Sequence, residues 1–274
     1  MSDLAHTIEK MVKMKTIVFL GALLPGVGCY LCIAYTYIFQ FEKVLNFTQG
    51  QVCHNVHNIF PPVSYSIGVW EPQRFFWLLI MFLHVPSRMF FLVLYRRLFL
   101  QSAPAQKYTW FQTLTNIFVV TMWSEIGGLL MVTVFPVKFF WIHSSGYTVW
   151  ITAFNFNMLF NVILHHYGGV RVQLERTFWI KVFTLLFTFS LTLSTAITFP
   201  LFIQYCSTPA YIAFSIAEYA LVGLNSVYYC VIYWEFPKTR ITIGIMPGDQ
   251  NSRKTTQVSV ITCNEDEDDL KVPI

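Results

Sequence analysis

Four ionisable side chains lie inside long apolar runs of this sequence. His84 and Arg88 share one run, Glu125 lies in a second, and Glu218 lies in a third. An ionisable group in hydrocarbon is costly unless it finds a partner or lines a water-filled cavity. Imidazole and carboxylate groups can move protons, and a guanidinium group can bind a phosphate or a developing oxyanion. These four residues are therefore the first candidates for a functional site.

The elements that carry them belong to an integral membrane protein. Hydrophobic residues make up 55% of the chain, charged residues make up 12%, and the mean hydropathy is +0.53. Soluble domains contain about 25% charged residues, and a membrane-spanning helix needs about 20 apolar residues. We predict an all-α fold, a polytopic bundle of six transmembrane helices. The predicted helices lie near residues 16–38, 75–95, 110–135, 147–166, 178–203 and 211–233.

The distribution of Lys and Arg predicts that both termini are cytosolic. With a cytosolic N-terminus, fourteen Lys and Arg residues fall in inside segments and three, Lys43, Arg74 and Lys138, fall outside. Cytosolic loops carry such an excess, so the net charge of +4 reflects topology and does not indicate a nucleic-acid partner. The predicted regions are a cytosolic segment (1–15), a six-helix domain (16–236) with a luminal loop (39–74), and a disordered cytosolic tail (237–274).

Two further features agree with this orientation. Asn46-Phe47-Thr48 is an acceptor triplet for N-glycosylation and falls in the first outside loop. Cys53 and Cys206 also fall outside, where an oxidising lumen permits a disulfide. Two free thiols are the alternative.

The buried ionisable residues lie at similar depths on separate helices. At about 1.5 Å per residue, His84 lies roughly 14 Å and Glu125 roughly 15 Å below the outer surface, and Glu218 lies roughly 10 Å below it. Arg88 is deeper but lies on the His84 face, because residues four apart share one side of a helix. Asn225 shares the Glu218 face. We therefore expect a polar site in the luminal half of the bundle.

Other interpretations of these residues remain open. Arg88 can form an ion pair with Glu125 or Glu218 that only holds the bundle together. Arg74, next to Gln73 at the mouth of the second helix, can bind a phosphate or anchor the helix at the lipid interface. The sequence contains no phosphate loop, Gly-x-Ser-x-Gly elbow or His-Glu-x-x-His motif. We predict no metal and no cofactor, and we expect the His165-His166 pair to lie at the cytosolic interface.

Several ordered motifs of this chain resemble one family. They are similar to the post-GPI attachment to proteins factor 2 family of the DRAM-like superfamily, and they span nearly all of residues 16–236. The proline after His84 is shifted relative to the family pattern. The motifs are Cys53, Pro62-Val63-Ser64-x-Ser66-Ile67-Gly68, Glu71-Pro72-Gln73-Arg74, His84-x-Pro86-x-Arg88, Glu125, His143, Tyr205-Cys206, Glu218-Tyr219, Asn225 and Trp234-Glu235-Phe236.

The resemblance implies a role in GPI-anchor lipid remodelling in the Golgi or endoplasmic reticulum membrane. The family is associated with the step in which a fatty acid is returned to lyso-GPI, so the implied partners are the lipid of GPI-anchored proteins and membrane lipids. As a hypothesis, His84 is a general base oriented by Glu125 or Glu218. The predicted substrate- or phosphate-binding residues are Arg74, Arg88, Gln73, Asn225 and His143.

This hypothesis has two versions, which differ in the acyl donor. Acyl-CoA is cytosolic whereas the expected site is luminal, so a phospholipid donor or a cavity open across the bundle is required. Two other functions also fit the sequence. One is a non-enzymatic lipid-handling or scaffold protein that assists a separate acyltransferase. The other is a small-solute or proton-coupled transporter.

Overall fold

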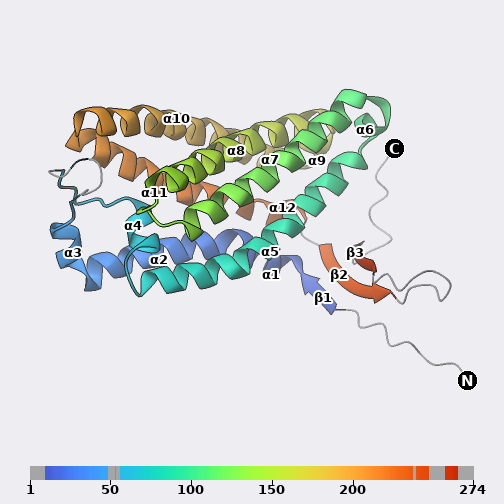
Figure 1. The fold of residues 1–274 in the computed structure, drawn as a ribbon. Coiled ribbons are helices and arrows are strands. Elements are labelled where there is room, and N and C mark those ends of the chain that lie inside the picture. Colours follow the sequence, from blue (N-terminus) through green and yellow to red (C-terminus); the bar gives the residue numbers. More distant parts are fainter. Residues whose placement is uncertain (1–9, 49–52, 54–55, 237–238, 247–256, 265–274) are drawn as a thin grey trace, which may run out of the picture.

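The computed structural model describes residues 10–48, 53, 56–236, 239–246 and 257–264. Within these residues, six helical segments are long and apolar enough to cross a membrane, and they run side by side (Figure 1). The segments are α1, η1 and α2 (Met14–Val18, Phe19–Leu23, Leu24–Phe39), α5 (Gln73–Leu100), α7 (Thr109–Val134), α8 (Phe140–Tyr167), α10 (Glu175–Tyr205), and α11 with α12 (Thr208–Cys230, Ile232–Glu235).

Short elements mark the two ends of the bundle (Figure 1). We call one end the loop end, where α3 (Phe41–Leu45), α4 (Val63–Gly68) and the α10–α11 junction lie. We call the other the strand end. It carries α6 (Ala103–Lys107), α9 (Val170–Gln173) and an antiparallel sheet in the order β1 (Lys10–Lys13), β2 (Thr239–Met246), β3 (Gln257–Asn264).

The six predicted helices correspond to the six observed ones, and the fourth differs most at its start. It begins at Phe140 instead of residue 147, so His143 lies inside α8 and not in a loop before it. The added turns start with Phe140, Trp141 and Ile142, which suit a lipid-facing helix. In the region expected to be a disordered tail, β2 and β3 form strands, and residues 237–238, 247–256 and 265–274 lie outside the described part of the chain.

Glycine allows α7 and α8 to pack with their backbones in contact. A Cβ atom on Gly128 would lie 2.5 Å from the backbone nitrogen of Trp150. On the facing helix, a Cβ on Gly146 would lie 3.0 Å from the backbone nitrogen of Val132. Small residues permit such close approach between membrane helices. This packing fixes the α7–α8 hairpin that carries His143.

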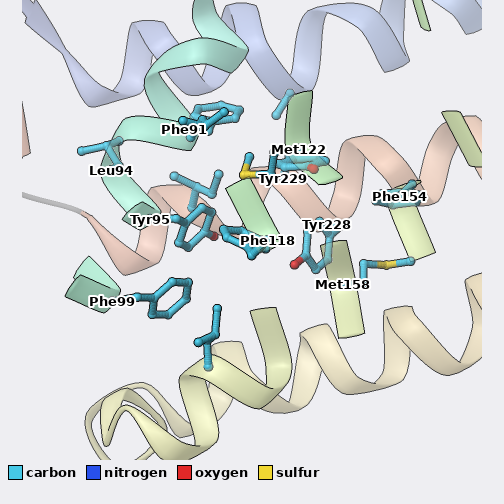
Figure 2. Packing of buried hydrophobic residues seen from close by; sticks show 14 of the residues in the cluster. Phe91, Leu94, Tyr95, Phe99, Phe118, Met122, Phe154, Met158, Tyr228 and Tyr229 are labelled. Atoms are coloured by element: carbon cyan, nitrogen blue, oxygen red, sulfur yellow. The ribbon is translucent and has the colours of Figure 1, made fainter. Parts of the chain in front are cut away.

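The largest apolar core lies toward the strand end. Figure 2 shows aromatic side chains of α5, α7, α8 and α11 converging there. Tyr95 and Phe99 of α5 pack edge-on against Phe118 of α7. In contrast, large apolar side chains such as Phe82 and Trp141, 76% and 78% exposed, cover the outside of the bundle. That distribution is the one expected of a protein that has hydrocarbon as its solvent.

A disulfide closes the loop end. Cys53 and Cys206 are bonded, with their Cα atoms 5.5 Å apart and a sequence separation of 153 residues. The bond ties the segment between α3 and α4 to the α10–α11 junction. Phe47, Phe202 and Tyr211 pack around it in a separate apolar cluster. Phe47 and Cys53 are therefore part of the folded end of the bundle.

Candidate functional site

Residues 58–64 cross the loop end and are hydrogen-bonded to one face of α11. Asn58 Nδ2 donates to Ser215 Oγ at 3.2 Å, and the hydroxyl of Tyr219 donates to the carbonyl oxygen of Pro61 at 2.5 Å. On the same face of α11, Glu218 Oε2 accepts a hydrogen bond from the backbone N–H of Val63 at 2.9 Å. These contacts fix the start of α4, and with it the position of the next residue, Ser64.

Ser64 lies between a histidine and a carboxyl group. Its Oγ is 2.9 Å from His143 Nε2 and 3.3 Å from Glu218 Oε1. The other ring nitrogen of His143, Nδ1, is 2.7 Å from the carbonyl oxygen of Phe135. Because a carbonyl only accepts, Nδ1 carries a proton and donates it there. All three side chains are buried.

Ser64 Oγ is within hydrogen-bond distance of both His143 and Glu218, so two arrangements of the protons are possible. If His143 is neutral, its Nε2 accepts the Ser64 proton, and a protonated Glu218 can donate to Ser64 Oγ. If His143 is charged, Nε2 donates to Ser64, which donates to the Glu218 carboxylate. In both arrangements the Ser64 hydroxyl proton has an acceptor within hydrogen-bond distance. The group can therefore move a proton without exposing any member to water.

An apolar cavity of about 310 Å³ opens beside this line of residues. Binding cavities for small molecules typically start near 300 Å³ and are mostly apolar with few polar groups. Burial raises the pKa of the Tyr65 phenol above its usual value, so this wall residue stays neutral. The walls come from α4, α8, α10 and α11, and they include Ser64, Tyr65, His143, Tyr147, Ile151, Thr195, Phe199, Phe202, Phe214 and Glu218.

Tyr147 adds a polar group with no strong partner. It lies one turn after His143 in α8, it lines the same cavity, and its hydroxyl is buried without a hydrogen bond of normal geometry. The side chain of Thr195, another residue of the cavity wall, interacts with this hydroxyl. The Tyr147 hydroxyl therefore lies within reach of a molecule in the cavity.

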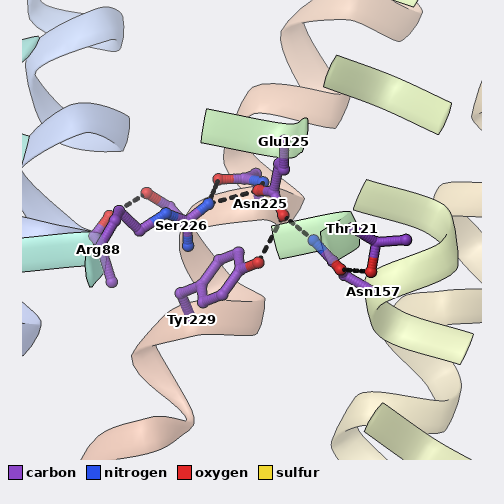
Figure 3. A network of polar contacts seen from close by, with 8 residues as sticks. Arg88, Thr121, Glu125, Asn157, Asn225, Ser226 and Tyr229 are labelled. Carbon is purple, nitrogen blue, oxygen red and sulfur yellow. Dashed lines mark hydrogen bonds and ion pairs between the residues drawn. The ribbon is translucent and has the colours of Figure 1, made fainter. Parts of the chain in front are cut away.

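Arg88, Glu125 and Asn225 belong to a second polar group (Figure 3). Arg88 Nη2 is 2.5 Å from Glu125 Oε1 and 3.3 Å from Asn225 Oδ1. Glu125 also accepts hydrogen bonds from Asn225, Asn157 and the Tyr229 hydroxyl, at 2.9, 2.6 and 2.6 Å. The Arg88 guanidinium stacks 3.2 Å above the centre of the Tyr229 ring. Each oxygen of Glu125 has two donors, whereas Arg88 Nη1 is buried without a hydrogen-bond partner among the described residues.

His84 lies one helical turn before Arg88 but is not hydrogen-bonded to either group among the described residues. It is buried next to the π-helical turn η1, with the backbone of Leu20 and Gly21 as its polar neighbours. Neither ring nitrogen forms a hydrogen bond of normal geometry among the described residues. The ring contacts neither Glu125 nor Glu218, so the structure does not bring the three predicted catalytic residues together. A pattern of depths along separate helices does not determine which faces meet.

The other predicted site residues lie at the loop end but outside the cavity wall. Gln73 is buried, and its Nε2 donates to Thr36 Oγ1 at 2.8 Å, which joins α5 to α2. Arg74 is half-buried, and no side-chain bond of it is found among the described residues. Asn46 is exposed directly after α3. Within the described part of the chain, no group of three or more His, Cys, Asp and Glu residues could hold a metal ion.

A third buried polar group, which was not predicted from the sequence, lies at the strand end. Lys181 Nζ lies 2.6 Å from Glu235 Oε1, and both side chains are fully buried. His165, expected at an interface, is also buried, with Nε2 3.3 Å from the same Glu235 oxygen. Tyr95 donates to Glu235 at 2.6 Å. The sequence feature that could have indicated this group is Lys181, a single Lys inside the apolar run of α10.

Comparison with known proteins places this architecture in one family. The family model described as the Frag1/DRAM/Sfk1/Cwh43P N-terminal domain matches residues 15–239. A Drosophila melanogaster protein named post-GPI attachment to proteins factor 2-like is 27% identical over 225 residues, which cover 79% of this chain and 67% of the relative.

For two further relatives, the matched region covers a larger share of the relative's own length. Acyltransferase PGAP2 of Xenopus tropicalis is 25% identical over 83% of this chain and 88% of the relative. Post-GPI attachment to proteins factor 2 of Caenorhabditis briggsae is 22% identical over 85% and 89%. No solved structure matches the chain.

Proposed function

The chain belongs to the Frag1/DRAM/Sfk1/Cwh43P N-terminal domain family, and we propose from this premise that it transfers a fatty acyl chain to the lyso form of a GPI-anchor lipid. Family membership indicates processing that follows GPI attachment. The observation that supports the specific step is Ser64 Oγ, held between His143 Nε2 and Glu218 at the wall of an apolar cavity.

We place the loop end in the lumen of the Golgi or endoplasmic reticulum. The glycosylation triplet at Asn46 and the Cys53–Cys206 disulfide both lie at this end, and both modifications belong to an oxidising, glycosylating compartment. The excess of Lys and Arg lies on the opposite side, as expected for cytosolic segments. The GPI lipid occupies the luminal leaflet, so its glycerol hydroxyl is on the side of the cavity.

The chemistry of acyl transfer needs a base, an acyl pocket and a donor to the oxyanion. His143 Nε2 is the base, because Nδ1 is occupied by the Phe135 carbonyl. The apolar wall formed by Ile151, Phe199 and Phe214 fits part of a saturated chain. Tyr147 supplies a hydroxyl proton toward the oxyanion. His143 thus takes the role that the sequence hypothesis assigned to His84.

Lys138 is positioned to meet the phosphate of the lipid. It is exposed in the α7–α8 turn, directly after Val137 of the cavity wall, and its Nζ lies 5.2 Å from the centre of the Phe139 ring. Arg88, in contrast, is buried and paired with Glu125, and it does not reach the cavity wall. We therefore assign phosphate contact to Lys138 and a structural role to Arg88.

The test is acyl transfer by the purified full-length chain in liposomes that contain lyso-GPI and a labelled diacyl phospholipid. We expect labelled GPI with the normal chain, and a loss of about 10²–10⁴-fold with His143→Ala, the size typical of a missing general base. His84→Ala is the matched control and should retain activity in proportion to its folded fraction.

Two outcomes would contradict this proposal. If the normal chain transfers no label from phospholipid or from acyl-CoA, the protein is not the transferase, and a lipid-presenting role for a separate enzyme takes its place. If His143→Ala retains full activity while His84→Ala loses it, transfer occurs but the base has been assigned to the wrong histidine.

A further inference from the structure

We propose that Ser64 itself carries the acyl chain, as an oxygen ester, between two half-reactions. This inference rests on the acyl-transfer function proposed above and adds a covalent intermediate to it. It also specifies the donor as an acyl ester of a membrane phospholipid. Such a donor lies in the same leaflet as the cavity, so cytosolic acyl-CoA is not required.

The geometry around Ser64 is that of an activated nucleophile. A nucleophilic hydroxyl needs a base within hydrogen-bond reach, and that base needs a third group to orient it. His143 Nε2 is 2.9 Å from Ser64 Oγ, and the Phe135 carbonyl holds His143 Nδ1 at 2.7 Å. The carbonyl fixes the tautomer in which Nε2 is free to accept the Ser64 proton. A backbone group therefore does here what a carboxylate does in other such arrangements.

The backbone that leads into Ser64 is held at two points. Tyr219 bonds the carbonyl of Pro61, and Glu218 accepts the N–H of Val63. Ser64 Oγ therefore stays at the cavity wall, and no rearrangement of the loop is needed to bring it to His143. Positioning of this kind lowers the entropic cost of the attack. Glu218 acts as a positioning residue in this scheme.

The first half-reaction transfers the chain to the protein. Ser64 Oγ attacks the carbonyl carbon of the donor ester, and its proton passes to His143 Nε2. The Tyr147 hydroxyl, buried without a strong partner at the same wall, donates to the oxyanion. The bond between the acyl carbon and the donor oxygen then breaks. That oxygen takes the proton from His143 and leaves as the alcohol of a lysophospholipid.

The second half-reaction reverses these steps with a different alcohol. The hydroxyl of the lyso-lipid acceptor gives its proton to His143 Nε2, and its oxygen bonds to the acyl carbon. The bond from that carbon to Ser64 Oγ breaks, and Ser64 recovers the proton from His143. One ester is exchanged for another, so no oxidant, cofactor or net proton is consumed. During both steps the acyl chain occupies the cavity.

The experiment looks for the acyl-protein in the absence of any lyso-GPI. The purified full-length chain is incubated in liposomes of phosphatidylcholine with a labelled sn-2 chain, and the intact protein is analysed by mass and for label. We expect one acyl group, resistant to neutral hydroxylamine, located on the Ser64 peptide. Ser64→Cys should carry the same group as a thioester, which neutral hydroxylamine releases. Ser64→Ala should carry none.

Ser66→Ala is the matched control, because Ser66 lies in the same short helix and its buried Oγ has no hydrogen-bond partner among the described residues. It should acquire label like the normal chain. Transfer to lyso-GPI without label on either the normal or the Ser64→Cys chain, with Ser64→Ala still active, would overturn the intermediate and leave the proposed function standing. Label on Ser64 without transfer to lyso-GPI would retain the intermediate and reject GPI as the acceptor. If neither label on Ser64 nor transfer to lyso-GPI is found, both the acyl-serine intermediate and the proposed function are rejected.

Discussion

Glu125 accepts hydrogen bonds from four side chains on three other helices. Arg88 comes from α5, Asn157 from α8, and Asn225 and Tyr229 from α11. Both carboxylate oxygens are saturated, so Glu125 has no free acceptor position for a substrate. The alternative of an ion pair that holds the bundle together therefore fits Arg88 and Glu125 better than a catalytic role does. Glu125 therefore has a structural role, whereas the Glu218 carboxyl group belongs to the candidate site.

This assignment predicts how Glu125 responds to substitution. Glu125→Ala leaves the Arg88 guanidinium buried without its counter-charge, which costs about 3–5 kcal/mol when one partner of a buried pair is removed. We expect a large fall in the yield of folded protein and in thermal stability in detergent. Acyl transfer per folded molecule should change little.

The double variant Arg88→Met with Glu125→Leu is the control, because replacing both charges by apolar groups of similar volume removes the unpaired charge. It should be more stable than Glu125→Ala. A Glu125→Ala protein that is as stable as the normal chain, yet inactive per folded molecule, would contradict the structural assignment and return Glu125 to the catalytic site.

At the scale of elements, three units must meet to form the candidate site. The α7–α8 hairpin supplies His143 and the Phe135 carbonyl, α4 supplies Ser64, and α11 supplies Glu218. The α7–α8 pair depends on backbone contact at Gly128. Since His143 lies on the same hairpin, a change in the spacing of these two helices moves the base relative to Ser64.

We predict that Gly128→Leu disrupts both stability and activity. The new Cβ alone would lie 2.5 Å from a backbone nitrogen of α8, so the helices must separate. Overpacking of this kind usually costs about 1–3 kcal/mol. Thermal unfolding in detergent and the liposome transfer assay measure the two effects.

Gly127→Leu is the matched control, since nothing lies within 4 Å of a Cβ placed there. This variant has the same change of composition in the same helix, and it should behave like the normal chain. Equal effects of the two substitutions would show that α7–α8 spacing does not position His143.

At the scale of the whole molecule, the bundle has two different ends. The strand end carries the sheet (Figure 1) and the buried Lys181–Glu235 pair, whereas the loop end contains the cavity, the disulfide and the exposed Asn46. The pair joins α10 to α12, and His165 and Tyr95 tie α8 and α5 to the same carboxylate. The strand end is therefore fixed by polar contacts, and the loop end by a covalent bond and the residue 58–64 contacts.

We predict that the loop end faces the lumen in cells. Epitope tags on both termini should react with antibody after selective permeabilisation of the plasma membrane, with luminal compartments still closed. Asn46→Gln should abolish any mobility shift caused by an endoglycosidase, with Thr48→Ala as a second disruption of the same triplet. Tags that become accessible only when internal membranes are opened would reverse the orientation and place the cavity on the cytosolic side.

The sequence by itself determined the membrane bundle, because a helix must satisfy its backbone polar groups internally in hydrocarbon and therefore appears as a long apolar run. Helix number and approximate bounds followed from these runs. The ionisable residues inside them marked His84, Arg88, Glu125 and Glu218 as candidates, and the family motifs included Ser64 and His143.

Only the tertiary structure decided which of these residues meet. Lipid is as apolar as the interior of the bundle, so the sequence of a membrane helix carries little sign of which face points inward. Ser64 and His143 are 79 residues apart, and nothing local relates them. Packing of α4 onto α11 and of α7 onto α8 brings them to 2.9 Å, while His84 at a similar predicted depth faces elsewhere. The depth of each residue along its helix can be estimated from the sequence. Which residues are in contact also depends on how each helix is rotated about its own axis, and that follows only from the packing.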